Sequence, residues 1–532
     1  MKIVLASSEA LPFSKTGGLA DVAAGLTKAL AAAGHQVTLI TPHYPHVFPA
    51  HAPRLPTRAR LQVPLGNRTI SAHLLRSEFP DSNVDVVLVD QQAFFNRPAL
   101  YTEGGSDYPD NCERFVFFSR AVIEAVHRLG LEPDVFHAND WQTGLIPALV
   151  AHEYRQLPGC ETTASVFTIH NMAFQGRFPA SAMELTGLDQ RLFNMHEMEF
   201  YGELNLLKTG IVFSDFATTV SPTYAREITR PEYGYGLERT CQAKLDRLVG
   251  ILNGVDLADW HPATDPHLPV RFSADTVAEG KAACKQALQH ELGLDDRPDA
   301  LLFGMVSRMT DQKGFDLIAA RAEDILRANV QFAFLGTGER QYEDFVAELA
   351  EKHPGRVAAT LGFNEGLAHR IEAGADAYLM PSRFEPCGLN QQYSLLYGTV
   401  PIVHAVGGLA DTVVDLRPDT ATDGTANGFV FHHYDANTFL ETVWRAVGCF
   451  LHDQETWAGL VQSGMRGDLS WNRSAAAYAE LYQKAITGLY VDRGLTPPGS
   501  AVPAGAAAMP GAAATPSQSP PGDSPRAVRG NK

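Results

Sequence analysis

Short apolar runs alternate with segments of helical periodicity along most of this chain. In the first half, six apolar runs are predicted to be buried strands, at residues 3–6, 36–40, 84–90, 134–138, 165–170 and 216–220. Between the first two, residues 19–30 carry apolar side chains at the i, i+3, i+4, i+7 spacing of a helix, and Gly34 is placed to end it. This alternation predicts a parallel sheet covered by helices on both faces.

The same alternation restarts after residues 254–264, which we expect to form a hinge. Five further strands are predicted at residues 301–306, 330–336, 359–363, 377–382 and 400–405. A late amphipathic segment, 473–490, predicts a helix that packs back across the first domain. We therefore divide the chain into a first Rossmann-like domain (1–255), a second (256–472), a C-terminal helix (473–495) and a tail (496–532).

These patterns define the expected fold class and the place where ligands bind. The chain is predicted to be an α/β protein with two doubly wound, Rossmann-like domains facing a central cleft. In open α/β sheets, ligands bind beyond the carboxyl ends of the strands. The tail is rich in Pro, Ala, Gly and Ser and lacks apolar periodicity, so we expect it to be disordered and to have no catalytic role.

Composition narrows the function classes. With 532 residues the chain is too long for a single core, and 45 % hydrophobic residues are enough to build two. The net charge of −17 argues against a nucleic-acid partner, because polyanion binding requires clustered Lys and Arg. The six cysteines form no C-x-x-C pair, which predicts reduced thiols and a cytoplasmic location. No apolar run approaches the roughly 20 residues that span a bilayer, and the first run is too short for a signal peptide.

The stretch SKTGGLADVAAGL, at 14–26, places a lysine and two glycines where the first strand gives way to a helix. Gly17 and Gly18 let the backbone approach a ligand, the helix start favours an anion, and Lys15 adds positive charge. The alternative is a tight turn with a solvated lysine. The same core recurs in VGGLADTVVDL, where Ala405 stands in place of the lysine, so we interpret the repeated turn as scaffold and Lys15 as its specialised part.

A second group of cations opens the second domain, in SRMTDQKGFDLI. Arg308 and Lys313 lie in the loop after the first predicted strand, where compact positive charge would stabilise a leaving diphosphate. The chain contains no D-x-D pair to hold a divalent metal, so these two residues would neutralise the diphosphate themselves. The alternative is a pair of solvated loop cations.

Three further positions lie at predicted strand ends. In PSRFEPCGL, Glu385 could hold sugar hydroxyls; it could instead cap a helix or pair with Arg383. In FTIHNMAFQG, His170 ends a strand beside Asn171 at the cleft edge, although a lone histidine is often structural. In HANDWQTG, Asp140 and Trp141 suit a sugar site, or else form an N-cap aspartate beside a core tryptophan.

Taken together, the motifs resemble those of the bacterial glycogen synthases and plant starch synthases, which extend α-1,4-glucan from a nucleotide sugar. Eight motifs occur in family order and span roughly residues 1–490: KTGGLADV, HANDWQTG, TIHNMAFQG, GILNGVD, SRMTDQKG, GFNEGLAH, RFEPCGL and VGGLADTV. The resemblance implies a GT-B fold and transfer of glucose from ADP-glucose to the 4-hydroxyl of an α-1,4-glucan such as glycogen, with retention of configuration and release of ADP. It implies no metal or other cofactor.

The resemblance also implies residue roles. Arg308 and Lys313 would stabilise departing ADP, Glu385 would hold the donor, and His170 would line the glucose pocket. The remaining positions are expected to bind substrate: Lys15, Gly17, Gly18, Asn171, Asn253, Cys387, Gly388 and Leu389 on the donor sugar and phosphates, Phe363 against the adenine, and Glu9, Asp21, Asp140 and Trp141 on the acceptor side.

Two positions depart from the family pattern. Gln142 stands where the family commonly has His, which weakens the acceptor-side assignment there. Tyr393 stands where related glycosyltransferases carry a second glutamate, so we expect Glu385 to act as the single carboxylate, and a double displacement through a glycosyl ester is less favoured.

Three other functions compete with this one. A related GT-B enzyme could use UDP-glucose or make a small disaccharide, and a non-catalytic glucan-binding protein could keep the two-domain cleft. A pyridoxal-phosphate phosphorylase shares the fold type but tends to be longer. Mere glucan binding needs no diphosphate cradle, whereas Lys15, Arg308, Lys313 and Glu385 occur together here. The sequence leaves the oligomeric state open.

Overall fold

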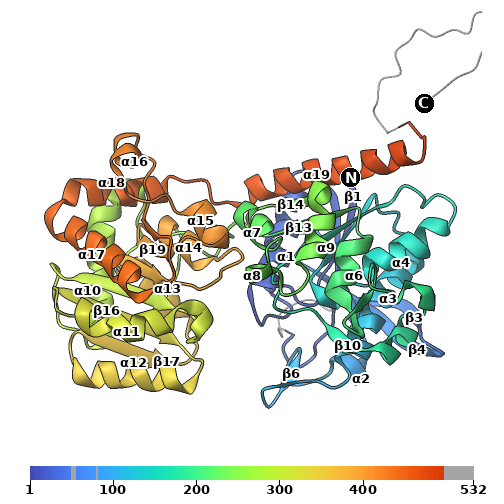
Figure 1. Ribbon diagram of the computed structural model, residues 1–532, viewed down its shortest axis with the longest axis horizontal. Coiled ribbons are helices and arrows are strands. Elements are labelled where there is room, and N and C mark those ends of the chain that lie inside the picture. Colours follow the sequence, from blue (N-terminus) through green and yellow to red (C-terminus); the bar gives the residue numbers. More distant parts are fainter. Residues whose placement is uncertain (49–54, 80–81, 497–532) are drawn as a thin grey trace, which may run out of the picture.

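The computed structural model describes residues 1–48, 55–79 and 82–496, so almost all of the predicted tail lies outside the described residues. Two α/β domains lie side by side (Figure 1). Each is built on a sheet whose central strands are parallel, which confirms the predicted fold class.

The first domain has a nine-stranded sheet in the order β14-β13-β9-β8-β1-β2-β5-β4-β3. Its seven parallel strands are β1 (Lys2–Ala6), β2 (Gln36–Pro42), β5 (Asp85–Asp90), β8 (Val135–Asn139), β9 (Ala164–Ile169), β13 (Phe216–Thr219) and β14 (Leu248–Gly250). Two long antiparallel strands, β3 (Leu55–Leu65) and β4 (Arg68–Glu78), extend one edge. The strand order reverses at β1, which pairs with β2 on one side and β8 on the other. Such a reversal is where a doubly wound sheet binds its ligand.

Helices lie between the strands of this sheet along the chain, and the first of them covers residues 19–30, which the periodicity predicts to be helical. They include α1 (Gly18–Ala32), α3 (Asn111–Leu129), α4 (Ile146–His152), α6 (Leu206–Phe213), α7 (Pro222–Glu227), α8 (Pro231–Gly234) and α9 (Glu238–Ala243). A small sheet of β10 (Arg177–Pro179), β12 (Glu203–Asn205) and β11 (Glu199–Phe200) lies apart from the main one. Gly34 follows Ala33, the C-cap of α1, with φ +88°, and ends that helix as predicted.

The second domain has a six-stranded parallel sheet in the order β17-β16-β15-β18-β19-β20. Its strands are β15 (Leu301–Val306), β16 (Val330–Gly336), β17 (Val357–Leu361), β18 (Ala377–Met380), β19 (Val400–His404) and β20 (Phe429–Phe431). The helices around it include α10 (Val277–Leu292), α11 (Phe315–Ile325), α12 (Arg340–Lys352), α13 (Glu365–Gly374), α14 (Asn390–Leu396), α15 (Gly407–Thr412), α17 (Ala436–His452) and α18 (Gln454–Met465). Strand β17 ends at Leu361, so Phe363 lies in the following loop and not in the strand predicted there.

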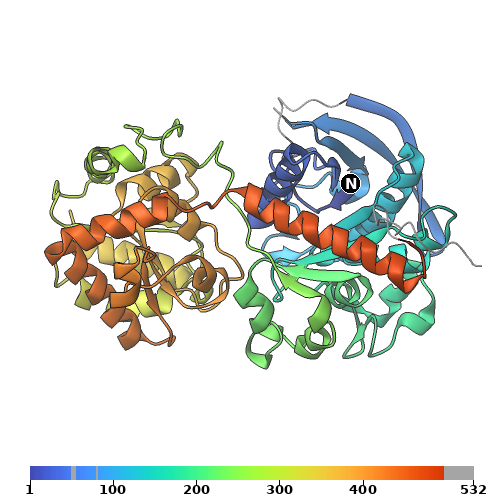
Figure 2. The ribbon, with the colours of Figure 1, turned by 90° about the horizontal axis from the view of Figure 1, so that it is seen from above.

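The chain passes between the domains twice, at neighbouring points. Val255 forms a parallel bridge with Ser470, and its amide donates to the carbonyl of Leu469 (2.8 Å). Beyond Ser470, helix α19 (Trp471–Asp492) returns across the first domain (Figure 2). Gly25 of α1 is required there, because a Cβ at this position would overlap the indole of Trp471.

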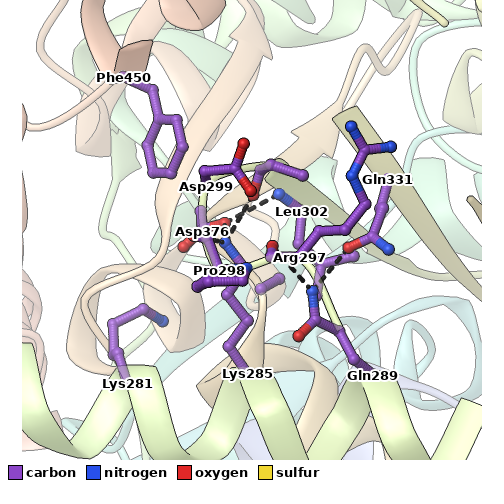
Figure 3. A network of polar contacts seen from close by, with 12 residues as sticks. Lys281, Lys285, Gln289, Arg297, Pro298, Asp299, Leu302, Gln331, Asp376 and Phe450 are labelled. Atoms are coloured by element: carbon purple, nitrogen blue, oxygen red, sulfur yellow. Dashed lines mark hydrogen bonds and ion pairs between the residues drawn. The ribbon is translucent and has the colours of Figure 1, made fainter. Parts of the chain in front are cut away.

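A buried polar network ties α10 to the start of the second sheet (Figure 3). Lys285 Nζ donates to the carbonyls of Pro298 (3.1 Å) and Ala300 (2.5 Å) and pairs with Asp376 Oδ2 (2.7 Å). The same Asp376 oxygen accepts the Leu302 amide (2.8 Å). The Lys285 ammonium therefore satisfies the carbonyls of Pro298 and Ala300, which lie in the loop before β15. It holds that loop against α10 at the start of the strand.

Candidate active site

A buried carboxylate, Glu9, organises the turn between β1 and α1. Thr16 Oγ1 donates to both Glu9 oxygens (3.0 and 3.1 Å), and the Thr16 and Gly17 amides donate to Oε2. Tyr101 Oη donates to Oε1 (3.2 Å), and burial raises the pKa of Glu9. The sequence suggested open amides at this turn, but an internal carboxylate already occupies two of them.

Lys15 is held beside that turn by an ion pair. Its Nζ lies 2.9 Å from Asp21 Oδ1 in the first turn of α1, and burial raises the pKa of Asp21. The lysine side chain remains 45 % exposed, so it reaches solvent in front of the turn. Gly18 faces the second domain, because a Cβ there would lie 3.9 Å from Leu389 Cδ1. Two segments predicted to contact the donor are thus brought together across the domain boundary.

His170 and Asp140 meet at the adjoining ends of β8 and β9. Asp140 Oδ1 accepts the His170 amide (2.7 Å), and His170 Nε2 lies 3.0 Å from Asn139 Oδ1. The Asn139 amide nitrogen donates to the Ala6 carbonyl, which leaves its oxygen to accept the Nε2 proton of the histidine. Burial lowers the pKa of His170 to about 3, so the imidazole is neutral and its Nδ1 is the acceptor.

Asp140 is strained. Its φ of +57° and ψ of 178° lie in a region that is almost confined to glycine. Burial raises the pKa of its carboxyl to about 7. It caps no helix through its side chain, so the N-cap alternative does not describe it. Its carboxylate instead positions the backbone of His170.

Trp141 lies in the core. It is 9 % exposed and packs against the rings of Phe115 (5.1 Å between centroids) and Phe178 (5.7 Å). A Cβ at Gly176 would also overlap the indole. This placement corresponds to the core-tryptophan alternative and leaves little of the indole for a sugar. Neighbouring Asn171 is half-buried, and its Oδ1 accepts the Ala173 amide (2.9 Å).

In the second domain, Lys313 and Glu385 form an ion pair between the loops after β15 and β18. Lys313 Nζ lies 2.6 Å from Glu385 Oε2, and the two side chains are 18 % and 9 % exposed. Ser382 Oγ donates to the same oxygen (3.2 Å). Arg383 is not the partner of Glu385, because it pairs with Asp316 (2.9 Å). Glu385 also lies five residues before α14 and does not cap it.

Arg308 is exposed, and its side chain makes no ion pair or hydrogen bond with any residue that the structure describes; its backbone carbonyl accepts from Ser307 Oγ (3.3 Å). Its backbone is nevertheless well supported. Tyr378 Oη accepts the amide of the preceding Val306 (2.8 Å) and donates to its carbonyl (2.9 Å). Asn390 Nδ2 donates to Tyr378 Oη (2.8 Å) and to the same Val306 carbonyl (3.1 Å). An uncommitted cation on a braced loop is suited to meet an anionic ligand.

The Cys387–Gly388–Leu389 turn follows Glu385 and is tightly packed. Gly388 has φ +71°, and burial raises the pKa of the Cys387 thiol to about 12, so this thiol stays protonated. Asn253, at the exit from the first domain, contacts that thiol, and its Oδ1 is buried without a hydrogen-bond partner in the described residues. The GILNGVD motif is thereby joined to the second-domain turn.

The second Gly-Gly turn braces Glu385 and the domain boundary. The Gly408 amide donates to the carbonyl of Glu385 (3.2 Å), and a Cβ at Gly407 would overlap that carbonyl. The Gly407 amide donates to Glu227 of α7 (3.1 and 3.2 Å), a residue of the first domain. Asp411 also accepts from Thr223 Oγ1 (2.6 Å). The second Gly-Gly turn is therefore scaffold, and its structural task is to connect the two domains.

Several supporting residues carried no signal in the sequence. Tyr101 reaches Glu9 from 92 residues away, and Glu227 reaches Gly407 from 180 residues away. Tyr378 supports the Arg308 loop from within a strand. Phe363, by contrast, is 90 % exposed and is not brought against any other candidate residue that the structure describes.

The described residues contain neither a membrane-spanning helix nor a metal-binding cluster. No helix in the described part of the chain is both long and apolar enough to cross a bilayer. Within 1–48, 55–79 and 82–496, no three His, Cys, Asp or Glu side chains gather in an arrangement that would hold a metal ion.

Comparisons with known proteins agree with this architecture. The family model "Starch synthase catalytic domain" matches residues 2–243, and "Glycosyl transferases group 1" matches residues 291–455. Glycogen synthase from Anaeromyxobacter dehalogenans (strain 2CP-C) is 48 % identical over 484 residues, covering 91 % of this chain and 99 % of that protein. Glycogen synthase from Rhodopirellula baltica is 42 % identical over 498 residues, covering 92 % and 98 %.

Solved structures extend the comparison. The catalytic domain of starch synthase IV from Arabidopsis thaliana, bound to ADP and acarbose, matches with a TM-score of 0.84 and 33 % identity, covering 91 % of this chain and 99 % of that one. Sucrose-phosphate synthase from Thermosynechococcus elongatus shares the fold alone, with a TM-score of 0.54 and 17 % identity. The two family models together cover most of both domains, and the relatives match over nearly their whole length. The chain therefore belongs to the glycogen and starch synthase family of GT-B glucosyltransferases.

Proposed function

We propose that this protein transfers glucose from ADP-glucose to the non-reducing 4-hydroxyl of an α-1,4-glucan, with retention of configuration and release of ADP. The observation that carries the proposal is the convergence of cations and turns at the domain boundary. Lys313, paired with Glu385, and the uncommitted Arg308 follow strand ends of the second sheet. Gly18 of the Lys15 turn faces Leu389 from the first domain.

Each group has a chemical task in this proposal. Arg308 and Lys313 stabilise the charge that accumulates on the diphosphate as the bond from glucose C1 to the phosphate oxygen breaks. Glu385 holds donor hydroxyls. The neutral imidazole of His170 offers Nδ1 as an acceptor for a sugar hydroxyl, which an imidazolium could not do. The other substrate-binding positions keep the roles that the family resemblance implies.

The reaction then proceeds on one face of the sugar. The C1–O bond loosens towards an oxocarbenium-like state, and the acceptor 4-hydroxyl attacks from the side of the leaving group. A departing phosphate oxygen takes the hydroxyl proton, so no separate base is required. Closure of the domains would exclude the water that otherwise hydrolyses the donor.

We also propose that the enzyme needs no metal or organic cofactor and acts in the cytoplasm. The chain lacks a D-x-D pair, and Arg308 and Lys313 supply the positive charge that a metal would otherwise bring. All six cysteines lie within the described residues and are unpaired thiols, as expected in a reducing compartment.

The decisive experiment measures incorporation of labelled glucose into glycogen from ADP-glucose and from UDP-glucose. Arg308→Ala should reduce kcat at least about 10²-fold, the scale of losing one preorganised charge at a developing anion. Its melting temperature should not change, because the Arg308 side chain is exposed and makes no ion pair or hydrogen bond in the described residues. Arg340→Ala is the control, since that side chain is 91 % exposed in the same domain. Near-normal turnover by Arg308→Ala, or preference for UDP-glucose, would contradict the proposal.

A further inference from the structure

In the described residues, three amino acids other than glycine have a positive φ: Asp140 (+57°), Tyr201 (+51°) and Tyr235 (+49°). Such conformations are rare for bulky residues, and strained backbone tends to persist where function requires it. Asp140 lies in the candidate active site, against His170. The two tyrosines are not used by the proposed mechanism, so their strain needs its own explanation.

Tyr201 occupies the tip of a tight hairpin. Phe200 of β11 pairs with Glu203 of β12, so the loop consists of Tyr201 and Gly202 alone, with φ of +51° and +82°. A two-residue turn with both φ positive favours Asn-Gly, and a tyrosine at its first position costs stability. The Tyr201 side chain is nevertheless 82 % exposed. Packing therefore does not account for an aromatic residue here.

Tyr235 also precedes a glycine and has a positive φ, but it does so as the left-handed C-cap residue of α8, beside the second domain. It is followed by Gly236 with φ +85°, and its side chain is 42 % exposed. The ring of Tyr235 lies 6.2 Å from that of Phe384, the residue before Glu385. This strained tyrosine of the first domain therefore stands next to the loop that carries the donor-side carboxylate.

The two tyrosines belong to one surface. Phe200 stacks edge-on against Tyr201 (4.7 Å between centroids), and a Cβ at Gly236 would lie 2.9 Å from the Phe200 ring. Phe200 is buried and so forms the floor between them.

A third exposed aromatic residue joins this surface from the loop that contains His170. Phe174 is 56 % exposed. The side chain of the next residue, Gln175, donates to the carbonyl of Tyr235 (3.0 Å) and accepts from Asn205 (2.8 Å), so the segment that carries Phe174 is joined to Tyr235 and to the end of β12. We call Phe174, Tyr201 and Tyr235 the aromatic track.

We propose that the aromatic track binds the acceptor glucan chain beyond the glucose unit that reacts. Sugar rings present apolar C–H faces that pack on aromatic rings, while the tyrosine hydroxyls can bond to their hydroxyl groups. Tyrosine also supplies rigid contact area at low entropic cost. The track is continuous with the site through Phe384, and an uncharged polymer suits a chain of net charge −17. The choice of an α-1,4-glucan rests on the proposed function.

Tyr201→Asn and Tyr235→Asn test this inference, because asparagine tolerates a positive φ and removes the ring. For each variant, kcat/KM is measured with maltotriose and with maltoheptaose, together with the KM for ADP-glucose. The advantage of maltoheptaose over maltotriose should shrink about 3- to 10-fold, the scale of one aromatic contact. The KM for ADP-glucose should stay within about twofold of wild type, and the melting temperature should stay equal or rise because strain is relieved.

Leu245→Asn is the matched control, since Leu245 is 61 % exposed in the same domain but outside the track. An unchanged preference for maltoheptaose in both tyrosine variants overturns the proposal. A lower melting temperature with equal losses on all three substrates also overturns it, because the tyrosines would then be structural. If the wild type transfers no glucose from ADP-glucose, the proposed function fails. Calorimetric titration with maltoheptaose then tests the aromatic track without relying on glucose transfer: wild type should bind the oligosaccharide, and the two tyrosine variants should lose this binding.

Discussion

Replacing Lys313 by methionine tests whether the Lys313–Glu385 pair is held together for stability, for chemistry or for both. Methionine matches the length of the lysine stem but carries no charge. In the variant, Glu385 would keep only Ser382 Oγ as a side-chain partner, although its side chain is 9 % exposed. An unpaired buried carboxylate is costly, because the protein interior cannot replace its hydration.

The size of the effect follows from the burial of the pair. Removing one partner of a buried ion pair costs about 3–5 kcal/mol. Lys313 is 18 % exposed, so water reaches it partly and we expect a loss near the lower value, about 3 kcal/mol. Changing Glu385 to glutamine in the same protein removes the stranded charge. The double variant should therefore recover most of the lost free energy of unfolding.

Activity should behave differently from stability. Neither the single nor the double variant has the cation that stabilises departing ADP, so kcat should remain at least about 10²-fold below wild type in both. Urea unfolding followed by circular dichroism gives the free energies, and ADP release in the presence of glycogen gives kcat. Lys352→Met is the control: its ion pair with Glu323 is more than half exposed on both sides, and exposed pairs contribute about 0–1 kcal/mol.

Two results would refute this reasoning. If Lys313→Met unfolds at the same urea concentration as wild type, the buried charge is not unsatisfied and the structural part is wrong. If the double variant regains activity together with stability, Lys313 serves only to neutralise Glu385, and its role at the diphosphate is wrong.

Three further changes probe the scaffold around the site. Gly407→Ala should lower both kcat/KM and the melting temperature, because its Cβ would displace the Glu385 carbonyl. Gly424→Ala is the control: Gly424 also has a positive φ, but its Cβ would meet no atom within 4 Å, so this variant should keep its activity. Asp140→Asn should change how stability depends on pH. Burial raises the pKa of Asp140 to about 7, the folded state favours the protonated carboxyl, and wild-type stability therefore falls as the pH rises from about 4 to about 7. The variant lacks this contribution, so its melting temperature should gain on wild type between about pH 4 and about pH 7, and parallel curves would contradict the assignment. Lys285→Met should lose about 3–5 kcal/mol in urea unfolding while folded enzyme keeps its kcat, because the Lys285–Asp376 pair lies at the amino ends of β15 and β18, opposite to the strand ends that Arg308 and Glu385 follow. An unchanged unfolding midpoint would show that the network contributes nothing.

The parallel core of both domains could be predicted because its strands are buried on both faces. Such strands are nearly continuous apolar runs, as in residues 301–306 and 330–336, and both runs are strands in the structure with the same bounds. Strands β3 and β4 were missed. They are antiparallel at the sheet edge, and β4 alternates buried and exposed positions, so it contains no apolar run. The three-residue strand Phe429–Phe431 was too short to stand out.

The site was only partly predictable. Glu385 and Lys313 follow strands as predicted, and His170 stands one residue beyond β9, where the prediction made it the last residue of the strand; parallel strands end at one edge of their sheet, which brings such positions together. The partner of Glu385 was not predictable: Arg383 is closer in sequence, but loop geometry selects Lys313, 72 residues away. The strain at Tyr201 was equally hidden, since a Tyr-Gly pair does not reveal its φ.

By itself, the sequence determined the two α/β domains, the order of their parallel strands along the chain and the loops in which charged residues follow those strands. This information is local, because hydrophobic periodicity depends on neighbours within a few residues. The tertiary structure alone decided which polar groups meet. It brought Tyr101 to Glu9 at the first Gly-Gly turn and Glu227 to the second, because hydrogen bonds require placement within a few tenths of an ångström by residues far apart in the chain.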